Sequence, residues 1–183
     1  YYTAKKEDGS YDFNPFFEYV KPWIEGADLA IGDFEGTISD RSPLGGYPLF
    51  NAPVQIADTM KDVGYDVVDL AHNHILDTGL YGLKYTDKVF KERGLDTIGV
   101  HADKNRSEDK ILIKEVNGIK IAILAYAYGY NGMDANLTAE DRTNHLSDLD
   151  EEKMKEEIQR AEKEADVTVV MPQMGVEYKL EPT

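Results

Sequence analysis

The sequence predicts an α/β domain with a mixed β-sheet, and three observations support this class. Amphipathic helical stretches alternate with short β-branched runs four times along the 183 residues, which is typical of parallel strands joined by helical crossovers. Asn117-Gly118 lies between two apolar runs, a strong signal for an antiparallel hairpin. Apolar residues make up 42% of the chain, enough for one sizeable core. We therefore expect a single domain over residues 1–183.

The first two helix and strand units lie in the N-terminal half. A helical stretch precedes a strand expected at 29–31. The second helix is expected to begin at Pro53, because proline suits the first turn, and to end at Gly64. Its strand is expected at 67–70 and leads directly into a polar cluster.

The last two units repeat this design. Gly94 is expected to end the third helix ahead of a strand at 97–100. Ser147 and Asp150, at the spacing of a capping box, precede the fourth helix, and its strand is expected at 167–171.

For two further segments the sequence predicts a conformation but no functional residue. The stretch at 128–144, rich in Gly, Asn and Asp, is expected to be irregular and to form either a lid or a surface excursion. The charged tract at 148–164 is expected to be a solvated helix face.

Composition and charge exclude several functions. The sequence has no run of about 18 apolar residues and no signal-peptide pattern, so we expect no membrane insertion by this segment. There is no cysteine, which excludes disulfides and thiolate chemistry. The net charge of −15 opposes binding to nucleic acid, and an anionic substrate would need a cation to meet it. We also expect both ends, Tyr1 and Thr183, to be truncation points, with any anchor outside them.

Polar residues that can bind metals or transfer protons follow four of the predicted strands. In parallel α/β sheets the ligand site lies beyond the carboxyl ends of the strands. The residues expected there are Asp33, Glu35, His72, Asn73, His74, His101, Gln173 and Glu177. Oxygen and imidazole ligands without thiolate suit manganese, iron or zinc.

The segment DVVDLAHNHILDTG is the most informative of these. His74 can bind a metal or donate a proton near neutral pH, and Asn73 can offer a metal its carbonyl oxygen. Asp77 either caps the following helix or orients His74. Turn chemistry alone explains Asn73 and Asp77 but gives no reason for two histidines, so we expect a functional cluster.

The other candidates have weaker local support. Asp33 and Glu35 are two residues apart, so in an extended strand both would face one side. The alternative is an ordinary charged loop after a strand. His101 has less support still, and His145 is expected to lie in a loop.

Four stretches carry a resemblance to a known family. They are ADLAIGDFEGTISDR, GYDVVDLAHNHILDTGLYGL, NGIKIAILAYAYG and VVMPQMGVEYKLEPT. In this order and spacing they resemble the bacterial capsule-synthesis CapA family, which is linked to poly-γ-glutamate capsules and is distantly similar to calcineurin-type metallophosphoesterases. The resemblance covers nearly the whole chain.

The resemblance implies a mixed β-sandwich flanked by helices (α/β/β/α) and, in the intact protein, two divalent metal ions at the strand ends. It implies that His74 contacts the substrate or protonates its leaving group, and we expect His74 and Asp77 together to be the catalytic residues. It also implies Asn73 as a metal ligand and places Glu35 at an acidic position of the family. With Asp33 and His72, which follow the same predicted strands, these are the metal ligands that we expect.

The sequence also departs from the family pattern. Asp33 stands where asparagine is commoner, and Gln173-Met174-Gly175 replaces a His-Trp-Gly-like segment. Glu177 falls in the family segment after the fourth strand. The family's opening Gly-Asp strand and its later Gly-His-x-x-His-like segment lie outside this chain.

Three readings of the function follow. The first is a metal-dependent hydrolase acting on a phosphoester or an anionic capsule polymer, with His74 as acid. The second is a non-catalytic cell-surface assembly or polymer-binding protein with a degenerate metal site. The third, an amidohydrolase using His72 and His74, is weakened because a (β/α)₈ barrel needs about 200 residues. The resemblance further implies a location outside the cytoplasm, membrane anchoring and a capsule-synthesis complex as partner.

Overall fold

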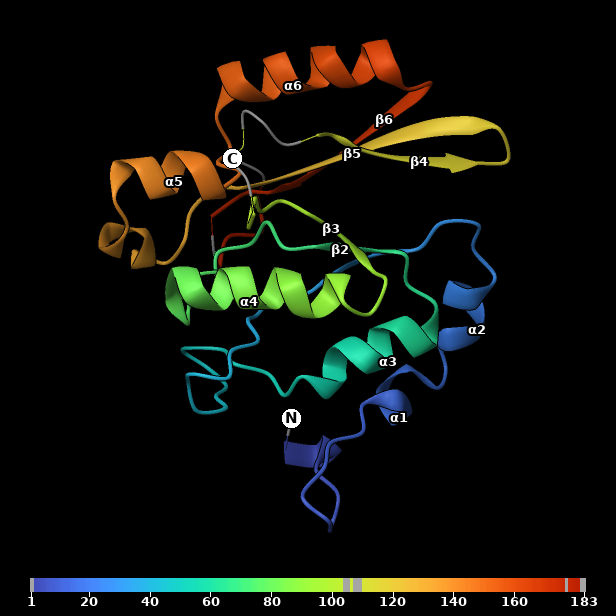
Figure 1. Cartoon of the computed structure of the whole chain (residues 1–183), viewed down its shortest axis with the longest axis vertical. Helices are drawn as coiled ribbons and strands as arrows, with labels where there is room; N and C mark the ends of the chain where they lie inside the picture. The colour runs from blue at the N-terminus through green and yellow to red at the C-terminus, as the bar shows by residue number, and fades with distance from the viewer. Residues whose placement is uncertain (1, 104–105, 107–109, 177, 182–183) are drawn as a thin grey trace.

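The computed structural model describes residues 2–103, 106, 110–176 and 178–181, which form two three-stranded sheets packed between helices (Figure 1). Helix α6 covers one sheet, and α3 and α4 cover the other. The helices are α1 (Asn14–Phe17), α2 (Lys21–Glu25), α3 (Gln55–Val63), α4 (Gly79–Lys91), α5 (Ala139–His145) and α6 (Glu151–Glu164), with 3₁₀ turns η1 (Tyr2–Ala4) and η2 (Met133–Asn136). The strands are β1 (Ile31–Asp33), β2 (Val67–Asp69), β3 (Asp96–Ile98), β4 (Leu112–Val116), β5 (Ile119–Ala127) and β6 (Val167–Gln173). The four-layer α/β/β/α class is confirmed.

The first sheet contains only parallel strands, in the order β1-β2-β3, joined by α3 and α4. Gly64 ends α3 in the left-handed conformation, as expected. The first strand begins at Ile31 rather than at 29, because the Asp66 carboxylate accepts the Ala30 N–H (2.8 Å) and ladder pairing starts only at Ile31. This shift brings Asp33 to the carboxyl end of β1.

The second sheet is mixed, with β5 antiparallel to β4 and parallel to β6. Asn117 and Gly118 both have positive φ (52° and 81°), as a tight hairpin turn requires, so that prediction is confirmed. The expectation of one mixed sheet is wrong, because the strands form two separate three-stranded sheets. The second sheet packs between α6 and the first sheet, so both faces of β5 are buried. Leu124 and Tyr126 pack under α6, whereas Ile123 and Ala125 join the core shared with the first sheet.

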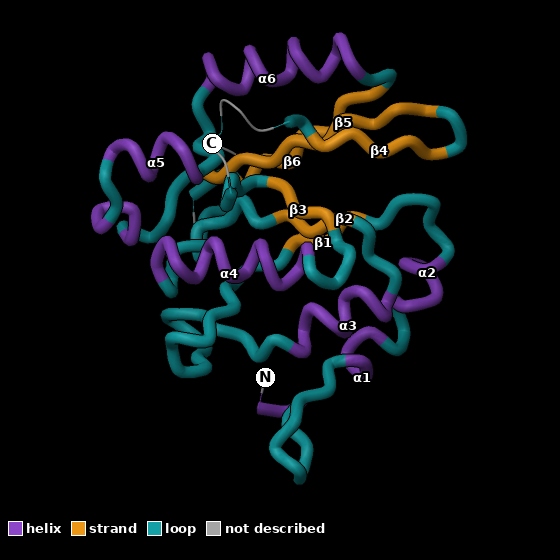
Figure 2. Tube along the Cα trace, in the orientation of Figure 1, coloured by secondary structure: helices purple, strands orange, loops and turns teal. Residues whose placement is uncertain are grey.

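Figure 2 shows that the stretch at 128–144, expected to be irregular throughout, contains η2 and nearly all of α5, while residues 128–132 form a loop. Thr138 caps α5 by accepting the Asp141 N–H (3.0 Å). The capping box is also wrong in detail, because Asp150 alone caps α6 by accepting the Lys153 N–H (3.0 Å). The first helical stretch splits into α1 and α2, each with a proline in its first turn. Within the described part of the chain, no helix has the length and apolarity needed to cross a membrane.

Gly99, directly after β3, supports the segment that carries the candidate site. Its φ is +85°, and an added Cβ would lie 2.5 Å from Ala71 Cβ and 2.6 Å from Ala71 N. We expect Gly99→Ala to lower the free energy of unfolding by roughly 2–4 kcal/mol, from left-handed strain plus overpacking. Gly118→Ala is the control, because its φ is +81° but nothing lies within 4 Å; it should lose only about 1 kcal/mol. Equal losses in urea unfolding would contradict the close approach.

Candidate functional site

A buried histidine, His72, follows shortly after the end of β2. His72 is fully buried, and its Nδ1 accepts the backbone N–H of His74 (3.2 Å), which fixes the ring. Its Nε2 makes no hydrogen bond. Burial first, and then the charge of His74, lower the pKa of His72 to about 3, with the Phe34 backbone opposing the shift. His72 is therefore a neutral core side chain that shapes the turn.

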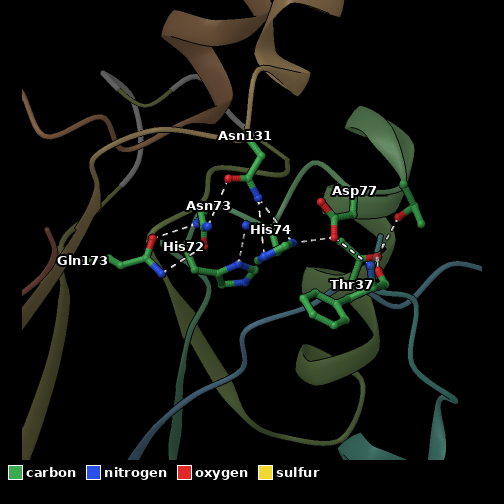
Figure 3. A network of polar contacts seen from close by, with 9 residues as sticks. Thr37, His72, Asn73, His74, Asp77, Asn131 and Gln173 are labelled. Carbon is green, nitrogen blue, oxygen red and sulfur yellow. Dashed lines mark hydrogen bonds and ion pairs between the residues drawn. The ribbon is translucent and has the colours of Figure 1, made fainter. Parts of the chain in front are cut away.

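His74 and Asp77 form a hydrogen-bonded pair at the start of α4 (Figure 3). His74 Nδ1 lies 2.8 Å from Asp77 Oδ2, and the same oxygen accepts the Phe50 N–H at 2.7 Å. The Phe50 ring packs edge-on against His74, with centroids 4.4 Å apart. The Asp77 side chain is buried, whereas 13% of the His74 side chain is exposed. Asp77 and Phe50 thus hold the His74 ring in place, and one edge of the ring stays accessible to solvent.

Asp77 does not cap α4. The N-cap residue is Thr78, with no side-chain capping bond, and the Asp77 carboxylate instead faces His74 and Phe50. Asp77 Oδ1 is buried without a hydrogen bond. Of the two roles expected for Asp77, the geometry is that of orienting the imidazole.

Three carboxamides surround this pair. Gln173, at the end of β6, accepts the Asn73 backbone N–H (2.8 Å) and donates to Asn73 Oδ1 (3.2 Å). Asn73 Nδ2 donates to Asn131 Oδ1 (3.1 Å), and Asn131 Nδ2 lies 3.4 Å from both ring nitrogens of His74. The second sheet and the loop after β5 therefore complete a cluster that begins on the first sheet.

A hollow of about 270 Å³ opens on His74. Asn131 lies beside His74 at its polar end. The remaining lining residues are Tyr47, Pro48, Leu49, Met133 and Tyr178, which give the hollow both polar and apolar surface. The hollow therefore gives a ligand access to the exposed edge of His74.

A second hollow, of about 390 Å³, is lined by Asp33, Asp69 and Gln173. The two aspartates are register partners on β1 and β2. Asp69 is buried, and its pKa is raised to about 7, by burial first and also by the Asp33 charge, against a hydrogen bond from Ala71. Partial burial and then Glu35 raise the pKa of Asp33 to about 6, although Asp33 keeps contact with solvent, which screens its charge better.

The structure does not bring every predicted residue here. His101 lies at a separate pocket of about 60 Å³, where its Nε2 is 3.1 Å from Ser147 Oγ. The reason is that Val100 forms a bridge with Leu146, which turns the chain toward the second sheet. Glu35 is exposed beyond the end of β1, and Glu177 lies outside the described residues.

The sequence did not predict two residues of the site. They are Asn131, beside His74, and Asp69, at the second hollow. Asp69 was read as part of an apolar strand expected to continue to Leu70, but β2 ends at Asp69. The signal that could have found it is the alignment of Asp33 and Asp69 at the ends of consecutive parallel strands. Asn131 has only the Asn-Gly dipeptide as a local signal.

Some of the described residues carry atoms that can bind a metal ion. Among them, no three His, Cys, Asp or Glu side chains form a group that could hold a metal ion. Asp33, Asp69 and Gln173 do meet around one hollow, and such oxygen donors suit a hard divalent cation. His72 fits poorly, because its Nδ1 lone pair already accepts the His74 N–H. The two-metal centre stays a prediction.

The fold and this cluster together define an α/β/β/α domain with a polar site at the carboxyl ends of its strands. The chain belongs to the bacterial capsule synthesis protein PGA_cap family, whose model matches residues 1–183. The predicted family is therefore confirmed.

Two curated relatives are capsule proteins. The chain is 27% identical over 172 residues to the PGA biosynthesis protein CapA of Bacillus subtilis (strain 168), covering 91% of this chain and 44% of the relative. It is 27% identical over 177 residues to the capsule biosynthesis protein CapA of Bacillus anthracis, covering 91% and 42%. The chain thus spans less than half the length of these relatives.

Two solved structures are distantly similar. One, from Staphylococcus aureus, is described as a 5′-nucleotidase (TM-score 0.48, 16% identity, 69% of this chain and 24% of that one). The other is the sulfate thiohydrolase SoxB of Thermus thermophilus (TM-score 0.49, 13% identity, 88% and 29%). At these TM-scores neither likeness says anything about the activity of this chain.

Proposed function

We propose that this chain carries the hydrolytic site of a capsule biosynthesis protein, with His74 as the proton-transferring group. The observation that carries the proposal is the His74 and Asp77 pair at the mouth of a hollow. Asp77 accepts the Nδ1 proton of His74, so the ring turns its Nε2 to the reaction. That nitrogen can give a proton to a leaving group or take one from an attacking water, a contribution of about 10²–10⁴ in rate.

Asp33 and Asp69 would hold a manganese, iron or zinc ion, with the remaining donors from outside the described residues. When bound, such an ion neutralises an anionic substrate and lowers the pKa of a water. The need for it follows from the charge of −15, which otherwise repels anions. A pair of ions in the intact protein, as the family resemblance implies, is part of the same proposal.

The substrate class we propose is an anionic capsule polymer or a phosphoester. The long relatives that this chain matches are capsule and PGA biosynthesis proteins. A place outside the cytoplasm, anchored to the membrane and joined to a capsule-synthesis complex, would bring the site to such a polymer.

A second candidate is a non-catalytic polymer-binding or assembly protein. One observation favours it: Asn73 Oδ1, the oxygen expected to bind a metal, accepts a hydrogen bond from Gln173 (3.2 Å). A metal at Asn73 would have to displace that bond, whereas a binding protein could keep it.

A calorimetric Mn²⁺ titration separates the two candidates. We expect the longest natural form of the protein that contains this chain to bind Mn²⁺, and Asp33→Asn to weaken binding at least about ten-fold, since a charged oxygen ligand is lost. Glu115→Gln, an exposed change on β4, is the control and should bind normally. Asn73→Ala weakens binding only if the Asn73 oxygen leaves Gln173 for the metal. If none of these forms binds Mn²⁺, the hydrolase proposal fails and polymer binding becomes the function to measure.

A further inference from the structure

Asn131 occupies a special position in the loop after β5. Its φ is +52° and that of Gly132 is +75°, so two successive residues adopt the left-handed conformation. Figure 3 shows the Asn131 side chain between Asn73 and His74. The segment is fixed from behind by Arg142, which forms ion pairs with Asp134 and Asp148. The loop therefore presents Asn131 to the site in a defined orientation.

The hydrogen bonds among the three carboxamides have one consistent direction. A backbone N–H can only donate, so the atom of Gln173 that faces the Asn73 N–H must be its oxygen. The Gln173 NH₂ group then donates to Asn73 Oδ1, which leaves the Asn73 NH₂ group to donate to Asn131 Oδ1. Consequently the NH₂ group of Asn131 faces His74.

This direction matches one form of His74. Asp77 accepts the proton on Nδ1, which leaves Nε2 with a lone pair when the ring is neutral. The NH₂ group of Asn131 lies 3.4 Å from each ring nitrogen, so these distances alone favour neither nitrogen. Because the Nδ1 proton is already turned to Asp77, the lone pair of Nε2 is the acceptor that the ring offers to this NH₂ group, and a proton on Nε2 would face it instead. An acceptor at the same place would favour the opposite form.

We propose that Gln173, Asn73 and Asn131 form a directed amide chain that holds His74 with a bare Nε2 toward the hollow, and that Asn131 is a positioning residue of the site. The consequence for catalysis rests on the proposed function, in which His74 transfers the proton. The direction of the chain does not rest on it, so the two can fail separately.

Gln173→Glu tests the direction. A carboxylate still accepts the Asn73 N–H but cannot donate to Asn73 Oδ1, so the Asn73 amide turns and offers its NH₂ group to Glu. Asn131 then turns as well and places its oxygen against His74. At alkaline pH, where an imidazole is neutral, ring ¹⁵N chemical shifts should show the Nδ1–H form in the parent protein. The variant should move toward the Nε2–H form by about five-fold, as one net hydrogen bond allows.

The new negative charge could act through space instead, and a double variant separates the two causes. Asn131→Gly removes the side chain while glycine keeps the positive φ without strain. If the amide chain transmits the change, Gln173→Glu has no effect on the ring in the Asn131→Gly background. If the same shift persists there, or if Gln173→Glu alone leaves the ring unchanged in a folded protein, the directed chain is overturned.

Activity provides the second readout. If the directed chain and the proposed function both hold, Gln173→Glu lowers kcat more than it raises KM, and Asn131→Gly cancels the additional effect. A tautomer change with no change in kcat would keep the chain and overturn His74 as the catalytic group. If Gln173→Glu leaves the tautomer unchanged while His74→Ala loses all activity, the directed chain is overturned and His74 stays the catalytic group.

Discussion

Replacing His74 by alanine is expected to reduce turnover by about 10²–10⁴ while the protein stays folded. The reason is that His74 is the one imidazole of the described cluster with an exposed edge, since 13% of its side chain is accessible whereas His72 is fully buried. Turnover of phosphoester and γ-glutamyl substrates by the longest natural form measures this loss, and circular dichroism checks the fold.

Asp77→Asn distinguishes orientation from mere presence of the imidazole. Asp77 Oδ2 accepts both the His74 and the Phe50 N–H groups, and Oδ1 is buried without a hydrogen bond. An asparagine that keeps its oxygen on those donors must bury an NH₂ group at the Oδ1 position. We therefore expect a loss of roughly 1–3 kcal/mol in stability and a fall in turnover approaching that of His74→Ala.

Asn73→Ala should also abolish activity without unfolding the chain, since it removes the link between Gln173 and Asn131. Tyr81→Phe is the control, because the Tyr81 hydroxyl contacts Asp40 outside the cluster. Full activity of both His74→Ala and Asn73→Ala would show that the site is assigned to the wrong residues.

Single helix ends and tight turns were the most predictable features of this structure, because they depend on the chemistry of a few neighbouring residues. Gly64 and Asn117-Gly118 adopt the conformations that their sequence signals predict. The strand ends were less predictable, since they depend on pairing with a distant segment. Asp69 was overlooked for this reason: only its register with Asp33 shows that it lies at the end of a strand.

The candidate site combines local and long-range features in the same way. His72, Asn73, His74 and Asp77 come from one segment, so a single motif was enough to find them. Gln173 joins them from 100 residues away, and only its place after a predicted strand indicated it. The prediction for His101 is wrong because the Val100–Leu146 bridge turns the chain after β3 toward the second sheet. Asn131 was not predicted because the sequence signal for a left-handed turn in the loop after β5 is only an Asn-Gly pair.

Asp69→Asn should make the protein more stable at alkaline pH and leave its stability nearly unchanged near pH 4. Burial and the Asp33 charge raise the pKa of Asp69 from its ordinary 3.8 to about 7 in the folded state. A raised carboxyl pKa means that the folded state favours the protonated form. The resulting stability is fully present below the unfolded pKa and is lost as the pH rises through 7. Asparagine carries no charge, and its oxygen can still accept the Ala71 N–H (2.8 Å).

The expected gain at pH 8.5 is roughly 2–4 kcal/mol, which is the free energy that a shift of this size represents at most. Urea unfolding between pH 4 and pH 9 measures it, with Asp33→Asn as a matched control that should gain less because Asp33 is exposed. Saturating Mn²⁺ should reverse the order above pH 7, because a bound cation stabilises the parent carboxylates and has less to bind in the variant. A gap between parent and variant that does not change with pH would mean that Asp69 is not desolvated.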